Sequence, residues 1–211
     1  MEFGLQLVFL IGLAAASALI ALLVMSSRLP ALSIWPCPDH RSWRALTFWS
    51  LFRIANVATL IVIAGTWTPG LSESPLRFLA AAVGAGCFIL YAMACVQLGR
   101  LNLYGATEGL NTEGIYRWSR NPQYATAIPG YIALAIGAAS APALGLALLV
   151  GIIFWQMATL EECWLIEAYG GAYDDYRRRV PRFYNVARSR GVLKRAVHNA
   201  RSKAEAIIRQ L

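Results

Sequence analysis

The sequence predicts an all-α membrane protein with about five transmembrane helices and a cytoplasmic amphipathic helix at its C-terminal end. Of its 211 residues, 58% are hydrophobic and only 14% are charged. Its apolar stretches are longer than the helices of a soluble core, and several reach the ~20 residues that a bilayer crossing needs. These two properties favour a chain that lies mostly within the bilayer.

Five segments are apolar and long enough to be predicted as spans. They are 5–25, 45–67, 76–98, 123–139 and 142–160, and the last two are short or tightly joined. No basic residue precedes the first apolar segment, and its length fits a span better than the apolar part of a signal peptide. We therefore expect the first segment to be a retained transmembrane helix.

The arginines between the predicted spans indicate an orientation. They gather after the first and third spans, at Arg28, Arg41, Arg44, Arg100, Arg117 and Arg120, whereas the loop after the second span offers only Arg77 beside Glu73. Because cytoplasmic loops are enriched in Arg and Lys, we expect the N-terminus outside. The loop after the third span and the whole C-terminal segment are then cytoplasmic.

The net charge of +8 raises the question of nucleic-acid binding. Its basic residues flank the spans or lie in the tail, and they form no nucleic-acid motif, so no nucleic-acid partner is expected. From Val186 to Leu211 apolar residues recur every three or four positions among Arg and Lys. This pattern predicts a helix on an anionic bilayer surface; packing of a solvated helix on a partner is the alternative.

The four cysteines form no disulfide framework, and only Cys37 and His40 have a spacing that suits a metal. Because the second pair of ligands that a structural zinc needs is missing, we expect no metal site.

Two polar blocks contrast with the apolar background. The first, 110–124, reads LNTEGIYRWSRNPQY, and the second, 160–183, reads LEECWLIEAYGGAYDDYRRRVPRF. Glu161 and Glu162 directly follow an apolar run, where an unpaired carboxylate is costly, so each should pair with Arg120 or with a ligand. Solvation of a helix end or a structural ion pair is the alternative. Tyr173 and Tyr176 would share one helix face, as a ligand wall or as interfacial packing.

In their order and spacing these blocks resemble the integral-membrane methyltransferases typified by isoprenylcysteine carboxyl methyltransferase and the phospholipid N-methyltransferases. The matching positions are Gly114, Tyr116, Arg120, Asn121, Pro122, Tyr124, Glu161, Glu162, Gly170, Tyr173, Tyr176, Val180 and Pro181. The resemblance covers roughly the C-terminal half of the chain, and the first hundred residues match only in being hydrophobic.

The resemblance implies one membrane domain over 1–211. Residues 1–100 would hold three N-terminal spans, 101–185 the motif loop, the helical hairpin and the cofactor-binding segment, and 186–211 the basic amphipathic tail. The implied cofactor is S-adenosylmethionine, and no strand followed by a G-x-G-x-x-G turn is present to suggest a Rossmann domain instead. The residues implied to bind it are Gly114, Tyr116, Arg120, Asn121, Pro122, Tyr124, Glu161, Glu162 and Tyr173.

The implied reaction is methylation of a membrane-embedded acceptor, foremost a phospholipid or amino-lipid headgroup, because Arg120-Asn121-Pro122 resembles that branch of the family. Residue 121 is His in the prenyl-protein branch, so Asn121 would orient the cofactor without moving protons. A headgroup amine must lose a proton before it attacks. Glu162, Glu161 and Arg120 are the expected catalytic residues, with either glutamate accepting the proton.

Three alternatives remain open from the residues. The acceptor can be an isoprenylcysteine-type carboxylate or a small thiol. The fold can serve an NADPH-dependent reduction, because sterol-reductase-like membrane enzymes share an R-x-P-x-Y-like element. It can also serve a noncatalytic membrane scaffold.

The expected substrate-binding residues are Arg53, Asn56, Tyr176 and Arg182. Arg53 lies about eight residues into the second span, roughly 12 Å deep, where a cation is expensive unless it is paired or functional. Its guanidinium can reach back to the interface or contact a lipid phosphate.

Overall fold

The computed structural model describes residues 2–29, 33–37, 39, 41–67, 74–105 and 108–184. These residues form only helices and connecting loops. The elements are α1 (Phe3–Arg28), α2 (Trp43–Thr66), α3 (Pro75–Leu98), α4 (Arg100–Leu103), η3 (Gly114–Arg117), α5 (Pro122–Gly137), α6 (Ala141–Tyr169) and α7 (Gly171–Arg179). The predicted amphipathic tail over 186–211 lies outside the described residues.

Four of these helices, α1, α2, α3 and α6, are long and apolar enough to cross a membrane. The prediction of helical spans is therefore confirmed at these four places, but the count of five is not. Helix α5 occupies the fourth predicted span and has 16 residues, roughly 24 Å at about 1.5 Å per residue. It is shorter than a complete crossing because it ends at the tight turn into α6.

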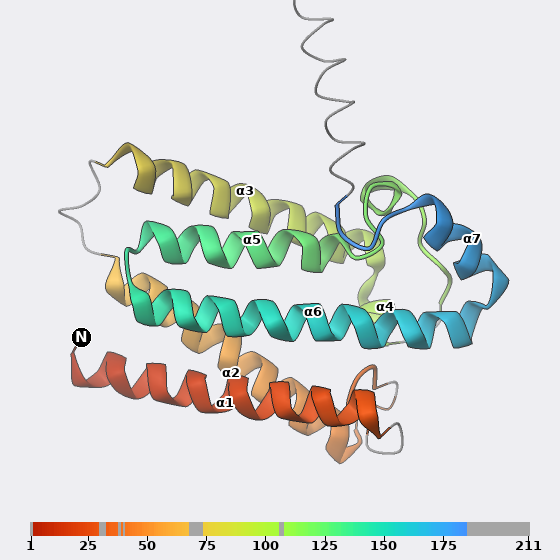
Figure 1. Ribbon diagram of the computed structural model, residues 1–211, viewed down its shortest axis with the longest axis horizontal. Helices are drawn as coiled ribbons and strands as arrows, with labels where there is room; N and C mark the ends of the chain where they lie inside the picture. The colour runs from red at the N-terminus through yellow and green to blue at the C-terminus, as the bar shows by residue number, and fades with distance from the viewer. Residues whose placement is uncertain are drawn as a thin grey trace, which may run out of the picture.

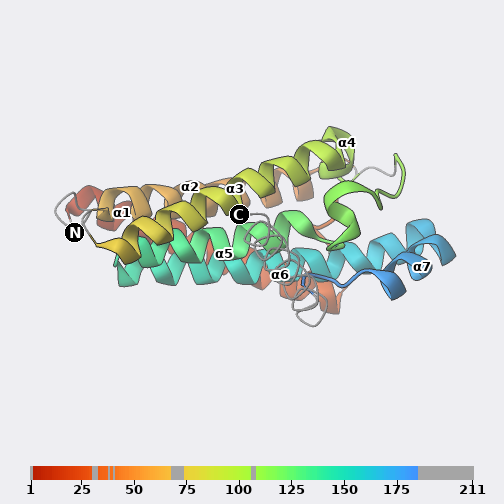
Figure 2. The ribbon, with the colours of Figure 1, turned by 90° about the horizontal axis from the view of Figure 1, so that it is seen from above.

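The long helices run side by side along one axis (Figures 1 and 2). Helix α3 packs along α5, α5 and α6 form a hairpin, and α6 also contacts the pair formed by α1 and α2. Helices α1, α3 and α6 end near α7, whereas the N-terminus lies at the opposite end of the bundle (Figure 1). All the motif residues are thus brought to one end, which is called the site end below.

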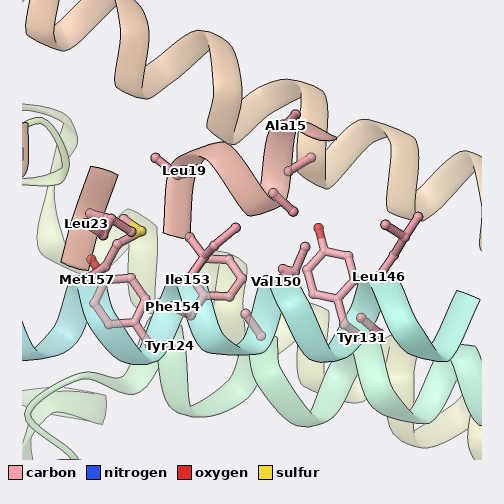
Figure 3. Packing of buried hydrophobic residues seen from close by; sticks show 14 of the residues in the cluster. Ala15, Leu19, Leu23, Tyr124, Tyr131, Leu146, Val150, Ile153, Phe154 and Met157 are labelled. Atoms are coloured by element: carbon pink, nitrogen blue, oxygen red, sulfur yellow. The ribbon is translucent and has the colours of Figure 1, made fainter. Parts of the chain in front are cut away.

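The core lies between α1, α5 and α6. Leu19 and Leu23 of α1 face Ile153 of α6, and Tyr124 and Tyr131 of α5 lie alongside (Figure 3). Large apolar side chains also cover the outer faces of the helices, which is the pattern expected where lipid surrounds the protein. Since lipid gives helices no hydrophobic reason to associate, close packing of small residues holds them together.

Helix α6 continues nine residues beyond the predicted end of the last span, to Tyr169. No glycine or proline interrupts the sequence between Gly151 and Gly170, and Gly170 ends the helix with a φ of 52°, a value that favours glycine. Glu161 and Glu162 therefore lie on a helix, not in the loop after one. The helix carries them from the bundle into the site end.

Arg77 was expected in the loop between the second and third spans. It lies instead in the first turn of α3, buried, where its Nε donates a hydrogen bond to the carbonyl oxygen of Gly137 at the end of α5. Its guanidinium also lies over the ring of Trp67, with Cζ 5.2 Å from the ring centroid. A cation at a helix C-terminus satisfies free carbonyls and opposes the negative end of the helix dipole.

A proline inside α5 creates an attachment point for the C-terminal segment. Pro129 has no N–H, so the carbonyl of Ala125, four residues earlier, loses its helical donor. The Tyr184 hydroxyl donates to this oxygen at 2.6 Å. The chain after α7 is thereby fastened back onto α5.

We expect Gly12→Leu to lower the free energy of unfolding by about 1–3 kcal/mol, the usual cost of overpacking. A Cβ at Gly12 would lie 2.7 Å from the Cβ of Ala58 on α2, so α1 and α2 would have to separate. Gly4→Leu in the same helix is the matched control, because a Cβ there meets nothing within 4 Å. Chemical denaturation in detergent micelles measures both, and equal stability of the two variants would contradict the packing account.

Candidate active site

Glu162 is the centre of an ion-pair cluster that joins the two motif blocks. Its Oε1 accepts from Arg120 Nε at 3.1 Å, Arg120 Nη2 at 3.0 Å and Asn121 Nδ2 at 3.0 Å. Its Oε2 accepts from Arg182 Nε at 2.9 Å and Arg182 Nη2 at 2.7 Å. Two cations and an amide thus surround one carboxylate that is almost fully buried, and the hydrogen bonds that Arg182 donates to Glu162 raise the pKa of Arg182.

Arg120 also binds the segment that follows α7. Its Nη1 donates to the carbonyl oxygens of Arg177 at 2.9 Å and Val180 at 2.8 Å, while its backbone N–H donates to Pro181 at 2.9 Å. Each guanidinium nitrogen of Arg120 is therefore engaged within the protein. Arg120 thus holds the V-P-R-F part of the motif in place by donating hydrogen bonds to the carbonyl oxygens of Val180 and Pro181.

Glu161 has a different environment from its neighbour. Its Oε2 accepts a hydrogen bond from the Tyr124 hydroxyl at 2.5 Å, and no arginine contacts it among the described residues. Successive residues of a helix point about 100° apart, so Glu162 faces the ion-pair cluster while Glu161 faces empty space. The sequence left open which glutamate has which role, and the helix gives the two different surroundings.

An open cleft lies at the site end, with about 450 Å³ of empty space that includes open solvent. It is bounded by the end of α3, the motif loop, α6 and α7. The residues that line it are Leu98, Asn102, Gly109, Leu110, Asn111, Tyr116, Arg120, Gln123, Glu161, Trp164, Leu165, Tyr169, Tyr173 and Tyr176. Five of the residues expected to bind a cofactor or substrate line this cleft: Tyr116, Arg120, Glu161, Tyr173 and Tyr176.

Tyr173 places a buried polar group without a partner in the wall of the cleft. Its side chain is 1% exposed, and its hydroxyl has no hydrogen-bond partner among the described residues. Buried polar groups in native proteins nearly always have partners. Burial raises the pKa of Tyr173, so the hydroxyl is a neutral donor and acceptor that a polar ligand would satisfy.

Tyr176 and Tyr116 hold the motif loop against α7. The Tyr176 hydroxyl donates to the carbonyl of Tyr116 at 2.7 Å, and the Tyr116 hydroxyl donates to Gln123 Oε1 at 3.0 Å. Burial raises the pKa of both phenols, so both remain protonated at neutral pH. Each phenol lines the cleft, but its hydroxyl donates its hydrogen bond to an acceptor within the protein.

Gly114 begins the 3-10 turn of the motif loop with a φ of 53°. A Cβ at this position would lie 2.1 Å from Nε2 of Gln97. Gln97, at the end of α3, donates from that nitrogen to Glu113 O at 2.8 Å and accepts from Ile115 N at 3.1 Å. Gly114 is therefore required by the loop's conformation and by the close approach of α3, and it is not among the residues that line the cleft.

The remaining predicted site residues lie elsewhere. Pro122 is the buried first residue of α5. Asn56 lies within the bundle, where it accepts a hydrogen bond from the Tyr131 hydroxyl at 2.7 Å. Arg53 lines a separate groove described below, and Arg182 is held by Glu162. The structure thus brings the two motif blocks together and leaves Arg53 and Asn56 apart from them.

A second cavity, called the aromatic chamber below, adjoins the cleft and has about 390 Å³ of empty space. Six rings line it, those of Trp35, Trp49, Phe52, Tyr91, Tyr124 and Phe154. Leu98, Gln123 and Glu161 line the chamber and the cleft alike. Glu161 is therefore the one acidic residue that both spaces share among the described residues.

Sequence reasoning missed several residues of the cleft. Asn102, Asn111, Trp164 and Tyr169 line it without belonging to the recognised motifs. Gln123 occupies the variable position of the R-N-P-x-Y element, so the motif does not identify it as a site residue. Its polar side chain in the first turn of an apolar helix was the one signal that pointed to it.

Comparison with known proteins gives one family. A model described as phospholipid methyltransferase matches residues 76–172, from the first turn of α3 to the start of α7. This match includes the R-N-P-Q-Y element and both glutamates, and it confirms the resemblance to integral-membrane methyltransferases. Neither the curated proteins nor the solved structures give a match.

We expect Glu162→Gln to lower the free energy of unfolding by about 3–5 kcal/mol, because it leaves the nearly buried Arg120 guanidinium without its counter-charge. Asp175→Asn removes the same charge from a pair with Arg178 in which both side chains are mostly exposed, and should cost less than about 1 kcal/mol. Denaturation in detergent micelles compares the two variants. A Glu162→Gln protein as stable as Asp175→Asn would show that the cluster does not hold the site end together.

Proposed function

We propose that this protein is an S-adenosylmethionine-dependent methyltransferase that methylates the headgroup amine of a membrane phospholipid. The observation that carries this proposal is the position of Glu161, on the wall between a polar cleft and an aromatic chamber. In this proposal the water-soluble cofactor would bind at the cleft, and a headgroup drawn from the bilayer would enter the chamber. The two reactants would meet beside Glu161.

The cleft residues suit S-adenosylmethionine, which supplies a methyl group from a sulfonium when bound. The unpartnered Tyr173 hydroxyl and the amides of Asn102, Asn111 and Gln123 offer hydrogen bonds to its hydroxyl, amino and carboxylate groups. The rings of Trp164 and Tyr169 offer faces for an adenine. These residues, more than Gly114 or Pro122, would hold the cofactor.

The aromatic chamber suits a cationic headgroup. Aromatic faces attract alkylammonium ions, and the Glu161 carboxylate would pair with the same ion. The amine must lose a proton before it can act as a nucleophile, and Glu161 would accept that proton. The Tyr124 hydroxyl fixes the orientation of this carboxylate. Positioning in a space shielded from water would supply much of the remaining acceleration.

Glu162 and Arg120 would act by positioning. The Glu162 carboxylate already accepts hydrogen bonds from two arginines and Asn121, so both of its oxygens are engaged inside the protein. Arg120 spends its donors on Glu162 and on the carbonyls after α7. Asn121 would likewise hold Glu162 in place. We therefore assign the chemical step to Glu161.

The site end would face the cytoplasm. Arg28, Arg41, Arg44, Arg100 and Arg117 all lie at that end, near the ends of α1 and α3 or the starts of α2 and α5, and cytoplasmic ends of membrane helices are rich in such residues. A cytoplasmic cleft has direct access to S-adenosylmethionine.

The contacts favour this function over the alternatives. A carboxylate or thiolate acceptor would be repelled by Glu161 in the chamber. NADPH carries several phosphates, yet Arg120 is the single cation that lines the described cleft, and its donors are engaged. A noncatalytic scaffold gives no reason for the unpartnered Tyr173 hydroxyl.

Tyr173→Phe should weaken binding of S-adenosylmethionine by about two- to tenfold, as expected for one lost hydrogen bond of about 0.5–1.5 kcal/mol. Tyr131→Phe is the matched control, because its hydroxyl is used by Asn56 inside the bundle. Tyr131→Phe should reduce stability and leave cofactor affinity unchanged. Tyr173→Phe should reduce cofactor affinity and leave stability unchanged. Calorimetric titration with S-adenosylmethionine and with NADPH measures the affinities, and binding of NADPH instead would refute the proposal.

Glu161→Gln should lower kcat for amine methylation by at least about 100-fold, within the range for loss of a general base. Its rate should rise with pH, because a growing fraction of the amine is then already deprotonated. Glu167→Gln, an exposed change on the same helix, should have no effect. Membranes incubated with a labelled methyl donor, followed by identification of the labelled lipid, provide the assay. Wild-type kcat in Glu161→Gln would exclude the base role.

A further inference from the structure

A groove on the lipid-facing side of α2 carries two arginines. It lies between α2 and α4, has about 990 Å³ of empty space, and is lined by Ala45, Leu46, Trp49, Ser50, Arg53, Arg100, Leu101 and Tyr104. It is called the arginine groove below. None of its residues belongs to the recognised motifs, and neither arginine takes part in the ion-pair cluster around Glu162.

Both arginines lack an anionic partner within the described chain. Neither forms an ion pair there, and the guanidinium of Arg53 contacts the Trp49 ring, with Cζ 5.8 Å from the centroid. Arg53 lies ten residues after the first residue of α2, about 15 Å along the helix at ~1.5 Å per residue. A cation at such a position in a membrane helix is expensive unless it is neutralised. Two cations converging on one groove make that cost larger.

The arginine groove and the aromatic chamber share one lining residue. Trp49 lines both the arginine groove and the aromatic chamber, and its ring lies 5.0 Å from that of Tyr104. The chamber in turn shares Glu161 with the cleft. The Trp49 side chain therefore lies between the groove and the chamber, so a lipid held at the groove would be next to the space that Glu161 lines.

We propose that the arginine groove binds the phosphodiester of the incoming phospholipid, an inference that rests on the proposed function. Charge complementarity selects this occupant, because a guanidinium presents a fork of N–H groups that matches phosphate oxygens. The leucines of the groove provide an apolar surface for the glycerol and acyl portion. Arg53 and Arg100 thus form an entry site that captures the lipid and directs its headgroup toward the chamber.

Such an entry site acts on capture of the acceptor and not on the chemical step. Arg53→Ala and Arg100→Ala should each raise KM for the lipid roughly tenfold, equivalent to about 1.4 kcal/mol, with little change in kcat or in affinity for S-adenosylmethionine. Arg53→Lys keeps the charge and should recover part of the loss. Arg41→Ala removes a charge at the same end of the bundle, outside the groove, and should leave KM unchanged.

A binding experiment tests the groove without relying on activity. Wild-type protein and the Arg53→Ala/Arg100→Ala double variant, both checked for thermal unfolding, are titrated in detergent with short-chain phosphatidylethanolamine, the matching diacylglycerol and inorganic phosphate. We expect the phospholipid to bind the wild type, to bind the double variant at least about tenfold more weakly, and to be displaced by neither of the other two probes.

Three results would overturn the inference: equal phospholipid affinity in the wild type and the double variant, an equal loss in Arg41→Ala, or binding of inorganic phosphate as tight as that of the lipid. The outcomes also separate this inference from the proposed function. Methylation of a phospholipid with unchanged KM in the arginine variants removes the entry site and leaves the function. Arginine-dependent lipid binding by a protein that does not bind S-adenosylmethionine supports the phosphate site and removes the function.

Discussion

The architecture of the site end depends on one buried carboxylate. Glu162 binds Arg120 and Asn121 from the start of α5 and Arg182 from the segment after α7. Three parts of the chain that are far apart in sequence therefore converge on two oxygen atoms. Because an unpaired charge at this depth is so costly, the cluster forms completely or the site end does not close. The cleft exists because α7 and the motif loop are held in these positions.

The two neighbouring glutamates have different surroundings because successive residues of a helix point in different directions. A rotation of about 100° per residue turns Glu162 into the cluster and Glu161 toward the space between cleft and chamber. Glu162 is immobilised by its partners, whereas Glu161 has a single tyrosine donor and keeps an oxygen for a ligand. One E-E pair can thus supply a clamp and a reactive group without any other acidic side chain near the reactants.

The cavities suggest how a small bundle serves two phases. The cleft opens at the site end, the arginine groove lies beside α2, and the aromatic chamber shares lining residues with both. In the proposed function each reactant arrives from the phase in which it dissolves. Glu161 lies between the chamber and the cleft, and Trp49 lies between the chamber and the arginine groove. The packing of the bundle fixes the positions of both side chains.

Much of this could be predicted from the sequence. Apolar segment length determined α1, α2, α3 and α6, because lipid forces every backbone polar group into helical hydrogen bonds. The cost of an unpaired carboxylate after an apolar run predicted a pairing of Arg120 with a glutamate, and Arg120 pairs with Glu162. Segment length could not determine that α5 is too short to count as a full span. It also could not show that Arg77 is buried at the end of α5.

Tertiary structure alone decided which role each polar residue has. It separated Glu161 from Glu162, gave Arg182 to an ion pair, placed Gln97, Asn102 and Asn111 around the motif loop, and left Arg53 beside Arg100 in a groove of their own. The contacts of Glu162 with Arg182 and Arg120 join residues 20 and 42 positions apart in the chain, and Arg120 contacts Arg177 at 57 positions. Residue type and local spacing determine what a side chain can bind, but packing determines which partner comes within reach.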